Sequence, residues 1–466
     1  MSATDLDARL TAAGQDHLVA HLAAASPEVR ARLGERLAAL DLELVGELRG
    51  TIDAPASVGE RRFEPPETIP LERSGGVADE AAAARATGEA ALRAGRVGFV
   101  LVAGGQASRL GYDGPKGCFP IGPVTDRSLF GFHAARIRAA AERYGFRPAW
   151  YVMTSPANDA PTRAFFAEHG HFGLAPDDVF FFQQEMLPAL DRQGRILLTA
   201  EDAPFLAPNG HGGTLDGLAR SGALADAKAR GIEHLSYFQV DNPLAPPADP
   251  LFVGLHASAG AQMSSKVVTK RGPGEKVGVL GLIDGVVGCI EYSDLPQDLR
   301  EATDDAGRLR FGAGNIAMHC IDVAFVESLT RDRLDLPWHL AKKRMQAYDL
   351  GAGEVREVDG VKFETFVFDA LAAAERTVTL EVDRAVEFSP VKNREGEDSP
   401  ASCRADLCRL HGAWLAELGR VPAFGPDDAP PVCEIDPLAA TSLEELRDLD
   451  DACFRTTERG TLVERA

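Results

Sequence analysis

A loop rich in glycine and positive charge is the part of this sequence best suited to chemistry. The apolar run 97–102 is typical of a buried parallel strand and is followed closely by Gly104 and Gly105. Glycine lets a ligand approach the backbone, and the N–H groups of such a loop form a concavity for anions. Arg109 and Lys116 add positive charge seven residues apart. The sequence therefore predicts a phosphate site; a tight turn with two solvated cations is the alternative interpretation of the glycines.

The spacing of these glycines separates the loop from two common nucleotide-binding motifs. The G-x-G-x-x-G spacing of dinucleotide-binding proteins is absent, as is the G-x-x-x-x-G-K-[ST] spacing of P-loops. An NAD-dependent oxidoreductase is therefore disfavoured.

A carboxylate follows another apolar run of the chain. Asp241 comes directly after the run 235–240. A carboxylate at the end of a parallel strand can hold Mg²⁺ (or Mn²⁺), because Mg²⁺ prefers one or two carboxylates together with substrate phosphates. The alternative is that Asp241 caps a helix, which the following Asn242-Pro243 would also suit.

The complete string 104–117 reads GGQASRLGYDGPKG and closely resembles the UTP:sugar-1-phosphate uridylyltransferases. It is most similar to the eukaryotic-type UDP-N-acetylhexosamine pyrophosphorylases, with Ser108 at a position where these enzymes have threonine. The resemblance continues in the same order over about residues 96–410. The further matching pieces are 182–188, 207–213, 240–242, 277–279, 291–293, 313–317, 366–369 and 387–393.

The resemblance implies a reaction between two polyanions. The oxygen of a sugar 1-phosphate attacks the α-phosphorus of UTP, and pyrophosphate leaves in line with the attack. Catalysis of this kind consists mainly of positioning and charge neutralisation. By resemblance, Arg109 and Lys116 stabilise the charge that moves onto the pyrophosphate, and Lys392 reaches the phosphates. Asp241 is the implied ligand of Mg²⁺ (or Mn²⁺).

The resemblance also assigns the two ends of the UDP-sugar. The backbone of Gly104 and Gly105 contacts the nucleotide, Gln184 reads the uracil edge, and the backbone of Gly210 contacts the base. An amide suits the uracil imide because it offers both a donor and an acceptor. The implied sugar-binding residues are His211, Gly278, Glu291, Asn315, Phe366 and Phe368.

The sugar end departs from the family pattern at two positions. His211 and Met318 stand where asparagine is usual. N-acetylglucosamine 1-phosphate is the expected sugar substrate, and glucose or galactose 1-phosphate is the alternative. Phe366 and Phe368 have a second interpretation as ordinary core residues. A non-catalytic protein that binds UDP-sugars is a further alternative, although such a protein would not need the leaving-group charges.

The elements that position these residues follow from hydrophobic patterning. Apolar runs at 149–153 and 179–182 join those at 97–102 and 235–240, and helical patterns such as 129–144 and 161–169 lie between them. This alternation predicts a parallel sheet flanked by helices. Strands are also expected at 264–270, 277–283 and 286–292, with a hairpin turn at Asp284-Gly285.

The predicted fold is α/β, with a glycosyltransferase-A-like, Rossmann-like mixed sheet flanked by helices, a helical N-terminal part and a small C-terminal domain. The expected boundaries are 1–95 for the helical N-terminal region, 96–392 for the catalytic domain, and 393–466 for the C-terminal region. The catalytic domain divides into a nucleotide half at about 96–260 and a sugar half at about 261–392. Helices are expected over 1 to about 50, over 79–93, and in the tail over 442–454, with a linker or extended packing arm at 52–76.

Composition limits the class of protein. The 466 residues carry 49 Lys and Arg against 70 Asp and Glu, which gives a net charge of −21, and 45% of the residues are hydrophobic. This acidic balance argues against a nucleic-acid partner. Seven scattered cysteines without a C-x-x-C pair favour a reducing, cytoplasmic setting. No signal peptide or membrane segment is expected, and the sequence does not decide between a monomer and a homo-oligomer.

Overall fold

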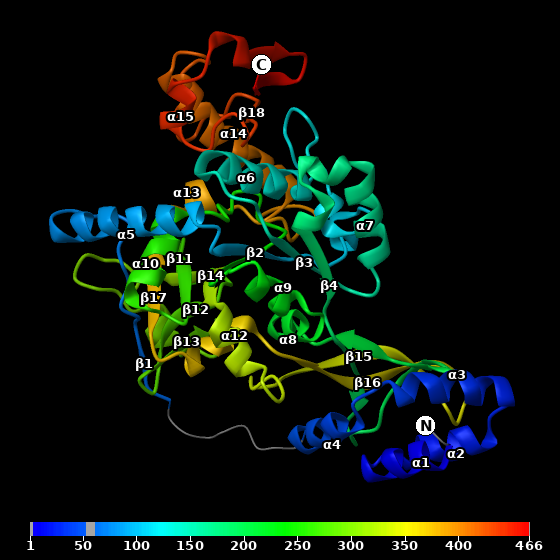
Figure 1. The fold of residues 1–466 in the computed structure, drawn as a ribbon. Coiled ribbons are helices and arrows are strands. Elements are labelled where there is room, and N and C mark those ends of the chain that lie inside the picture. The colour runs from blue at the N-terminus through cyan, green and yellow to red at the C-terminus, as the bar shows by residue number, and fades with distance from the viewer. Residues whose placement is uncertain (1–2, 53–60, 466) are drawn as a thin grey trace. The chain divides into compact units, whose positions relative to one another are not determined.

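The computed structural model describes residues 3–52 and 61–465. The chain folds into two compact units, each of which combines three segments (Figure 1). The first unit consists of residues 1–60, 184–213 and 335–367, and the second consists of residues 61–183, 214–334 and 368–466. Among the described residues, no helix has both the length and the apolar character needed to cross a membrane.

The second unit is built on a ten-stranded mixed sheet, which confirms the predicted α/β class. One side of this sheet is a run of four parallel strands in the order β10-β2-β3-β4, which ends at β4. These strands are β2 (Val97–Val102), β3 (Trp150–Thr154), β4 (Val179–Gln183) and β10 (His234–Gln239). All four lie within about two residues of the predicted apolar runs, because parallel strands covered on both faces are almost continuously apolar.

Antiparallel strands extend this sheet beyond β10. Strand β14 (Ala313–Asp322) pairs antiparallel with β10, and β12 (Val279–Ile283) and β13 (Val286–Ile290) form the predicted hairpin. Asp284 and Gly285 both have positive φ, as the two central residues of a type I′ turn require. The other members of the sheet are β1 (Phe63–Glu64), β11 (Met263–Thr269) and β17 (Thr377–Glu381).

Helices flank the sheet in the second unit (Figure 1). Ser128 caps the predicted helix α6 (Leu129–Tyr144) by accepting a hydrogen bond from Gly131 N–H, and Gly145 ends it with φ of 70°. Helices α5 (Gly76–Arg93) and α10 (Pro250–Ala259) cross so closely that an added Cβ at Gly88 would lie 1.8 Å from the carbonyl oxygen of Pro250. The remaining α-helices in or entering the described part of this unit are α7 (Asp159–Glu168), α8 (Gly213–Arg220), α9 (Ala223–Ala229), α11 (Gln297–Glu301), α12 (Val323–Leu329), α13 (Arg384–Glu387), α14 (Pro400–Glu417) and α15 (Leu443–Arg447).

The C-terminal tail differs from the prediction. The expected helix over 442–454 is only α15, five residues long, and the chain then forms β19 (Phe454–Thr457) and β20 (Gly460–Val463). These strands make a three-stranded sheet with β18 (Cys433–Ile435). The buried residues Cys433, Ile435, Leu446 and Val463 form the small core of this region, so burial rather than helical propensity determines its structure.

The first unit joins the N-terminal helices to a second sheet. The predicted helical region consists of α1 (Ala3–Ala12), α2 (Asp16–Ala24), α3 (Pro27–Ala38) and α4 (Leu42–Thr51). A long hairpin of β15 (His339–Asp349) and β16 (Glu354–Glu364) forms the centre of a five-stranded sheet. Its other strands are β6 (Leu190–Asp191), β7 (Leu198–Ala200) and β8 (Ala203–Pro204); β5 (Met186–Pro188) and β9 (Leu206–Pro208) pair separately. Leu18, Leu33 and Phe363 belong to one buried cluster, so the helices and the sheet share a core.

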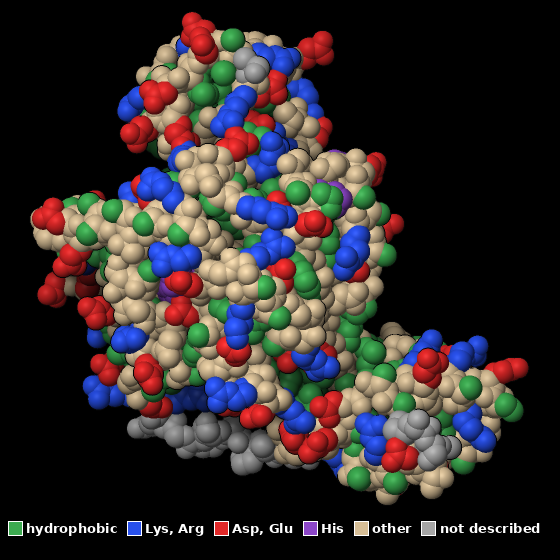
Figure 2. Space-filling view, in the orientation of Figure 1, with side chains coloured by type: hydrophobic (Ala, Val, Ile, Leu, Met, Phe, Trp, Pro, Cys, Tyr) green, Lys and Arg blue, Asp and Glu red, His purple; other side chains and the backbone are tan. Residues whose placement is uncertain are grey.

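The surface carries charges of both signs. On the face that Figure 2 shows, Lys and Arg side chains are interspersed with Asp and Glu. Positive charge is therefore not gathered there into one continuous surface.

Candidate active site

The predicted phosphate loop closes on itself at the carboxyl end of β2. Lys116 N–H donates to the carbonyl oxygen of Gly105 at 3.1 Å, and Ala107 N–H donates to that of Gly114 at 3.0 Å. An added Cβ at Gly105 would meet no atom within 4 Å, so the packing of the protein does not require glycine there. Close approach of a ligand to the backbone gives a physical reason for glycine at this position.

An asparagine that the sequence analysis missed holds this loop in place. Asn158 is fully buried at the start of α7. Its side-chain amide donates to the carbonyl oxygens of Ala103 at 2.8 Å and Gly105 at 3.2 Å, while its oxygen accepts from Ser155 N–H at 2.7 Å. No local pattern identifies this role, since the loop residues that Asn158 holds, Ala103 and Gly105, lie more than fifty positions away in the chain.

The structure brings two predicted residues together beside the loop. Lys116 Nζ lies 3.9 Å from Asp241 Oδ2, and both side chains are largely buried. Asp241 follows β10, the parallel neighbour of β2, so the loop and the carboxylate share one edge of the sheet. The helix-cap alternative for Asp241 is wrong, because the next helix begins at Pro250 and is capped by Asp249.

A glycine next to Lys116 fixes the approach of the loop to α6. A Cβ at Gly117 would lie 2.2 Å from the ring of Phe130, which is fully buried. Because that ring cannot move aside cheaply in a packed core, glycine is required at this position. Arg109 lies exposed in the turn Ser108–Leu110 of the same loop.

The segment that bears Lys392 is fastened to Asp241 through the backbone. Val391 N–H donates to the carbonyl oxygen of Asp241 at 2.9 Å. Asn242 supports the same segment, because its amide donates to the carbonyl of Glu387 at 2.7 Å and its oxygen accepts from Ser389 N–H at 3.1 Å. Lys392 itself is exposed, with Nζ 5.7 Å from the ring centre of Phe388.

A buried ionic cluster lies beneath this segment. Lys266 Nζ is 2.6 Å from a carboxylate oxygen of Asp249 and 2.6 Å from one of Glu387, and its side chain is completely buried. Burial alone would lower the pKa of Lys266, but the two carboxylates outweigh that effect and raise it. The lysine therefore stays charged and ties Glu387, in the segment of Lys392, to the sheet.

The surroundings of Asp241 fit a magnesium ion that takes most of its ligands from substrate. Among the described residues, Asp241 belongs to no group of three His, Cys, Asp or Glu ligand atoms. One carboxylate completed by phosphates and water is a normal arrangement for Mg²⁺.

Three of the predicted sugar-binding residues meet in the second unit. Asn315 N–H donates to the carbonyl oxygen of Gly278 at 2.8 Å, and a Cβ at Gly278 would lie 3.8 Å from Glu291 Oε1. Burial raises the pKa of the Cys289 thiol beside them, with the charge of Glu291 acting in the same direction. Met318 is buried in the main core and Phe368 is buried in the turn Val367–Ala373, so both contribute to packing.

The predicted uracil-binding residues lie in the first unit. Gln184 is buried, and Gly210 has φ of 83°. An added Cβ at Gly210 would lie 2.4 Å from the carbonyl oxygen of Thr365. Both the positive φ and the contact require glycine, so the backbone of this turn is closely fixed. Thr365 N–H donates to the carbonyl of Asn209 at 2.8 Å and holds the turn to the end of β16.

His211 and Phe366 form an aromatic stack in the same unit. Their ring centres lie 5.1 Å apart, and the ring planes are inclined to each other by 25°. The ring centre of His339 lies 4.3 Å from that of Phe366. His211 Nδ1 accepts a hydrogen bond from Val367 N–H at 3.1 Å, which assigns the proton of the neutral ring to Nε2. Burial, and secondarily the charge of His339, lowers the pKa of His211 to about 4, so the ring is neutral at pH 7.

The predicted residues thus fall into two sets, one in each unit. Gln184, Gly210, His211 and Phe366 belong to the first unit. The second unit contains Gly104, Gly105, Arg109, Lys116, Asp241, Gly278, Glu291, Asn315, Phe368 and Lys392.

Comparison with known proteins gives consistent matches over most of the chain. A family model described as UTP--glucose-1-phosphate uridylyltransferase matches residues 64–407. The human UDP-N-acetylhexosamine pyrophosphorylase-like protein 1 is 36% identical, over 96% of this chain and 94% of the relative. The UDP-N-acetylglucosamine pyrophosphorylase of Saccharomyces cerevisiae is 37% identical, over 71% of this chain and 72% of the relative. The crystal structure of the Trypanosoma brucei UDP-N-acetylglucosamine pyrophosphorylase in complex with an inhibitor is similar, with a TM-score of 0.82 and 29% identity over 96% of this chain and 95% of that one.

Proposed function

Since this chain belongs to the UTP--glucose-1-phosphate uridylyltransferase family, we propose that it converts UTP and a hexose 1-phosphate to a UDP-sugar and pyrophosphate. N-acetylglucosamine 1-phosphate is the proposed sugar substrate. This choice is supported by relatives named as UDP-N-acetylglucosamine pyrophosphorylases at 37% identity and by a solved structure of that name at 29% identity. The second unit is proposed to be glycosyltransferase-A-like, with the phosphate loop and the acidic residue on the neighbouring parallel strands β2 and β10.

The observation that carries the proposal is the pairing of Lys116 with Asp241 beside the phosphate loop. A cation and an anion 3.9 Å apart at the carboxyl end of β2 and β10 form a site for a charged ligand that brings its own cation. A polyphosphate with a divalent ion has this character. A site that only bound a neutral sugar would not need either charge.

The residues of the second unit divide the work of an in-line displacement. The backbone of Gly104 and Gly105 holds the phosphates of UTP, and Lys116 faces the oxygens on which charge develops as pyrophosphate leaves. Arg109 and Lys392 add to this field from exposed positions. Preorganised positive groups of this kind lower the barrier because they need no rearrangement when the charge moves.

Asp241 is the proposed ligand for Mg²⁺. Bound there, the metal ion would neutralise phosphate charge and polarise the phosphoryl oxygens. Lys116 balances part of the charge of Asp241, since its Nζ lies 3.9 Å from the carboxylate.

Roles in sugar recognition are proposed for residues of the second unit and, separately, for two residues of the first unit. Asn315 and Glu291 offer amide and carboxylate groups to sugar hydroxyls, next to the backbone of Gly278. In the first unit, His211 stands where the family has asparagine, and Phe366 stacks on it. The replacement retains a hydrogen-bond donor but adds a rigid ring, which would change the space available to the 2-substituent of the sugar.

The proposal is tested by following pyrophosphate release from UTP and Mg²⁺ with four sugar 1-phosphates. These are the 1-phosphates of N-acetylglucosamine, N-acetylgalactosamine, glucose and galactose. We expect release with N-acetylglucosamine 1-phosphate and the largest kcat/KM for it. A larger kcat/KM for glucose or galactose 1-phosphate would identify the alternative substrate. Tight binding of a UDP-sugar without release from any of the four would instead indicate a binding protein.

A further inference from the structure

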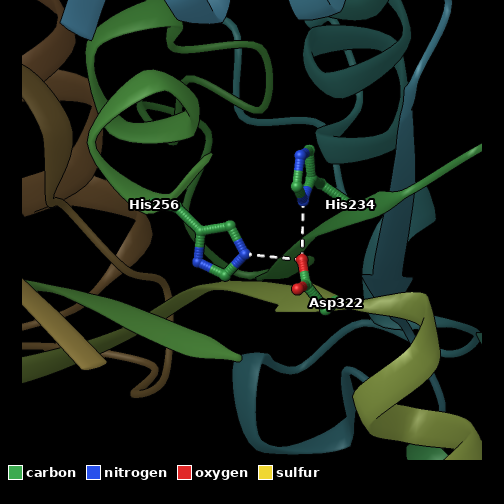
Figure 3. A group of neighbouring side chains, drawn as sticks. All are labelled: His234, His256 and Asp322. Carbon is green, nitrogen blue, oxygen red and sulfur yellow. Dashed lines mark hydrogen bonds and ion pairs between the residues drawn. The ribbon is translucent and has the colours of Figure 1, made fainter. Parts of the chain in front are cut away.

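A group of metal-ligating side chains lies at the opposite end of β10 from the candidate active site. His234 is the first residue of β10, whereas Asp241 lies two positions beyond its last residue, Gln239. Seven residues of extended chain span about 23 Å, so the two sites are separate. The group consists of His234, His256 and Asp322, whose ligand atoms all lie within 4.8 Å of one another (Figure 3).

The fold brings these three side chains together from three elements. His234 and Asp322 are directly opposite each other in the antiparallel pair β10–β14, so their side chains share one face of the sheet. His256 comes from the last turn of α10, which packs against β14 and β11. Figure 3 shows both imidazole rings directed at the carboxylate of Asp322.

The contacts of the group are close. Asp322 Oδ1 lies 2.6 Å from His234 Nδ1 and 2.9 Å from His256 Nε2. Two imidazole nitrogens and one carboxylate oxygen form a ligand set suited to Zn²⁺ and similar transition metals. Ligands bound to a tetrahedral Zn²⁺ lie about 3.3 Å apart, so small shifts of less than about 1 Å would admit the ion.

A neighbouring hydroxyl orients the buried histidine. His256 is completely buried, and its Nδ1 lies 2.8 Å from Ser264 Oγ. A metal-binding histidine characteristically uses its second nitrogen in this way, because the hydrogen bond fixes the ring and the tautomer. With Nδ1 donating to Ser264, the lone pair of Nε2 points at the group. The side chain of Asp322 is 29% exposed, which leaves a path from solvent for an ion and a water ligand.

We propose that His234, His256 and Asp322 bind one Zn²⁺ ion, or a similar divalent transition metal, with water as the fourth ligand. The bound metal would fasten α10 to β10 and β14 at the edge of the sheet away from the active site. It would be distinct from the Mg²⁺ proposed at Asp241, because imidazole ligands favour Zn²⁺ and Mg²⁺ prefers oxygen. This inference does not depend on the proposed enzymatic activity.

The competing explanation is a hydrogen-bonded group without metal. In that case Asp322 accepts hydrogen bonds from both rings and ties the same elements together. The two explanations differ in one respect, because only the metal site predicts a specific, stoichiometric affinity for Zn²⁺ that depends on all three side chains.

The test is a titration of the full-length, metal-stripped protein with Zn²⁺ in excess Mg²⁺, which occupies oxygen-only sites. The variants are His234→Gln and Asp322→Asn, since the completely buried His256 is a greater risk to folding. His169→Gln, which changes an exposed histidine after α7, is the matched control. Circular dichroism verifies that each variant is folded, and Co²⁺ provides a second probe through its visible absorption bands.

We expect one equivalent of Zn²⁺ to bind to the wild-type protein and to the His169→Gln control with equal affinity. Each of the two site variants should bind Zn²⁺ at least tenfold more weakly, because each loses a ligand. Zn²⁺ should also raise the thermal midpoint of the wild-type protein and not that of the folded site variants. Equal Zn²⁺ affinity in the wild type and in either folded site variant, or no stoichiometric binding to the wild type, would overturn the proposal.

Discussion

The loss of Lys116 should reduce turnover far more than it reduces stability. Two unit charges about 4 Å apart interact by about 4 kcal/mol at an effective dielectric constant of about 20. Lys116 Nζ lies 3.9 Å from Asp241, and a phosphate held between the loop and this carboxylate would lie at a similar distance. Because the Lys116 side chain is 20% exposed, solvent screens part of this interaction, and we expect a contribution of about 3–4 kcal/mol to the transition state.

At about 1.4 kcal/mol for each factor of ten, Lys116→Ala should lower kcat between about 100- and 1,000-fold. The assay is pyrophosphate release at saturating UTP and sugar 1-phosphate. The control is Lys228→Ala on α9, where the half-exposed lysine pairs with Glu327, and its kcat should equal that of the wild type. Lys116→Arg should recover only part of the rate, since a planar guanidinium does not replace a compact ammonium group.

Two results would refute this reasoning. A folded Lys116→Ala protein with less than a tenfold loss of kcat would remove the lysine from the leaving-group site. An increased KM for UTP with unchanged kcat would mean that Lys116 binds the ground state and the transition state equally.

Three other substitutions test the supporting structure and the proposed sugar site. Lys266→Ala removes the buried cation that Asp249 and Glu387 share, so it should lower the free energy of unfolding, measured in a urea titration, by about 3–5 kcal/mol. A change below about 1 kcal/mol would contradict a structural role. Asn158→Ala should lower kcat at least tenfold while the protein remains folded, because small displacements of a reacting group are costly; an unchanged rate would show that the loop holds its own shape. His211→Asn should change the ratio of kcat/KM between N-acetylated and plain sugar 1-phosphates, and an unchanged ratio would remove His211 from the sugar site. The same variant tests the pKa of about 4 for His211, because in the unfolded chain the ring takes up its proton near pH 6.5. Between pH 6.5 and pH 4, the free energy of unfolding of the wild type should therefore fall by up to about 3 kcal/mol more than that of the variant. Equal pH profiles of stability would contradict the assignment.

The sequence predicts the parallel part of the sheet well for a physical reason. Strands β2 and β3 are buried on both faces, so each is a short and almost continuous apolar run. Helix α6 spans the same residues as the predicted helical pattern 129–144, and in the structure a cap by the Ser128 side chain and the positive φ of Gly145 mark its two ends. Local chemistry is sufficient where one residue type determines where an element begins or ends.

Long-range pairing accounts for what the sequence did not predict. The hairpin of β15 and β16 is largely exposed and rich in charge, so it has no clear hydrophobic period. It joins the core of helices that lie about three hundred positions earlier in the chain, and no local pattern identifies that partner. The same is true of β19 and β20, which follow a C-terminal helix shorter than expected and form a sheet with β18.

The structure also divides the motif residues into two kinds that a resemblance alone does not distinguish. Lys116 and Asp241 present charge beside the phosphate loop. By contrast, the side chain of Asn242 bonds to the backbone, and Glu387 pairs with the buried Lys266. The second kind fixes where Asp241 and the segment of Lys392 lie, through bonds to main-chain atoms. Replacement of these supporting residues should therefore reduce stability and activity together. Replacement of Lys116 should reduce activity alone, and this contrast separates a residue that faces the reacting phosphates from one that only holds the site in place.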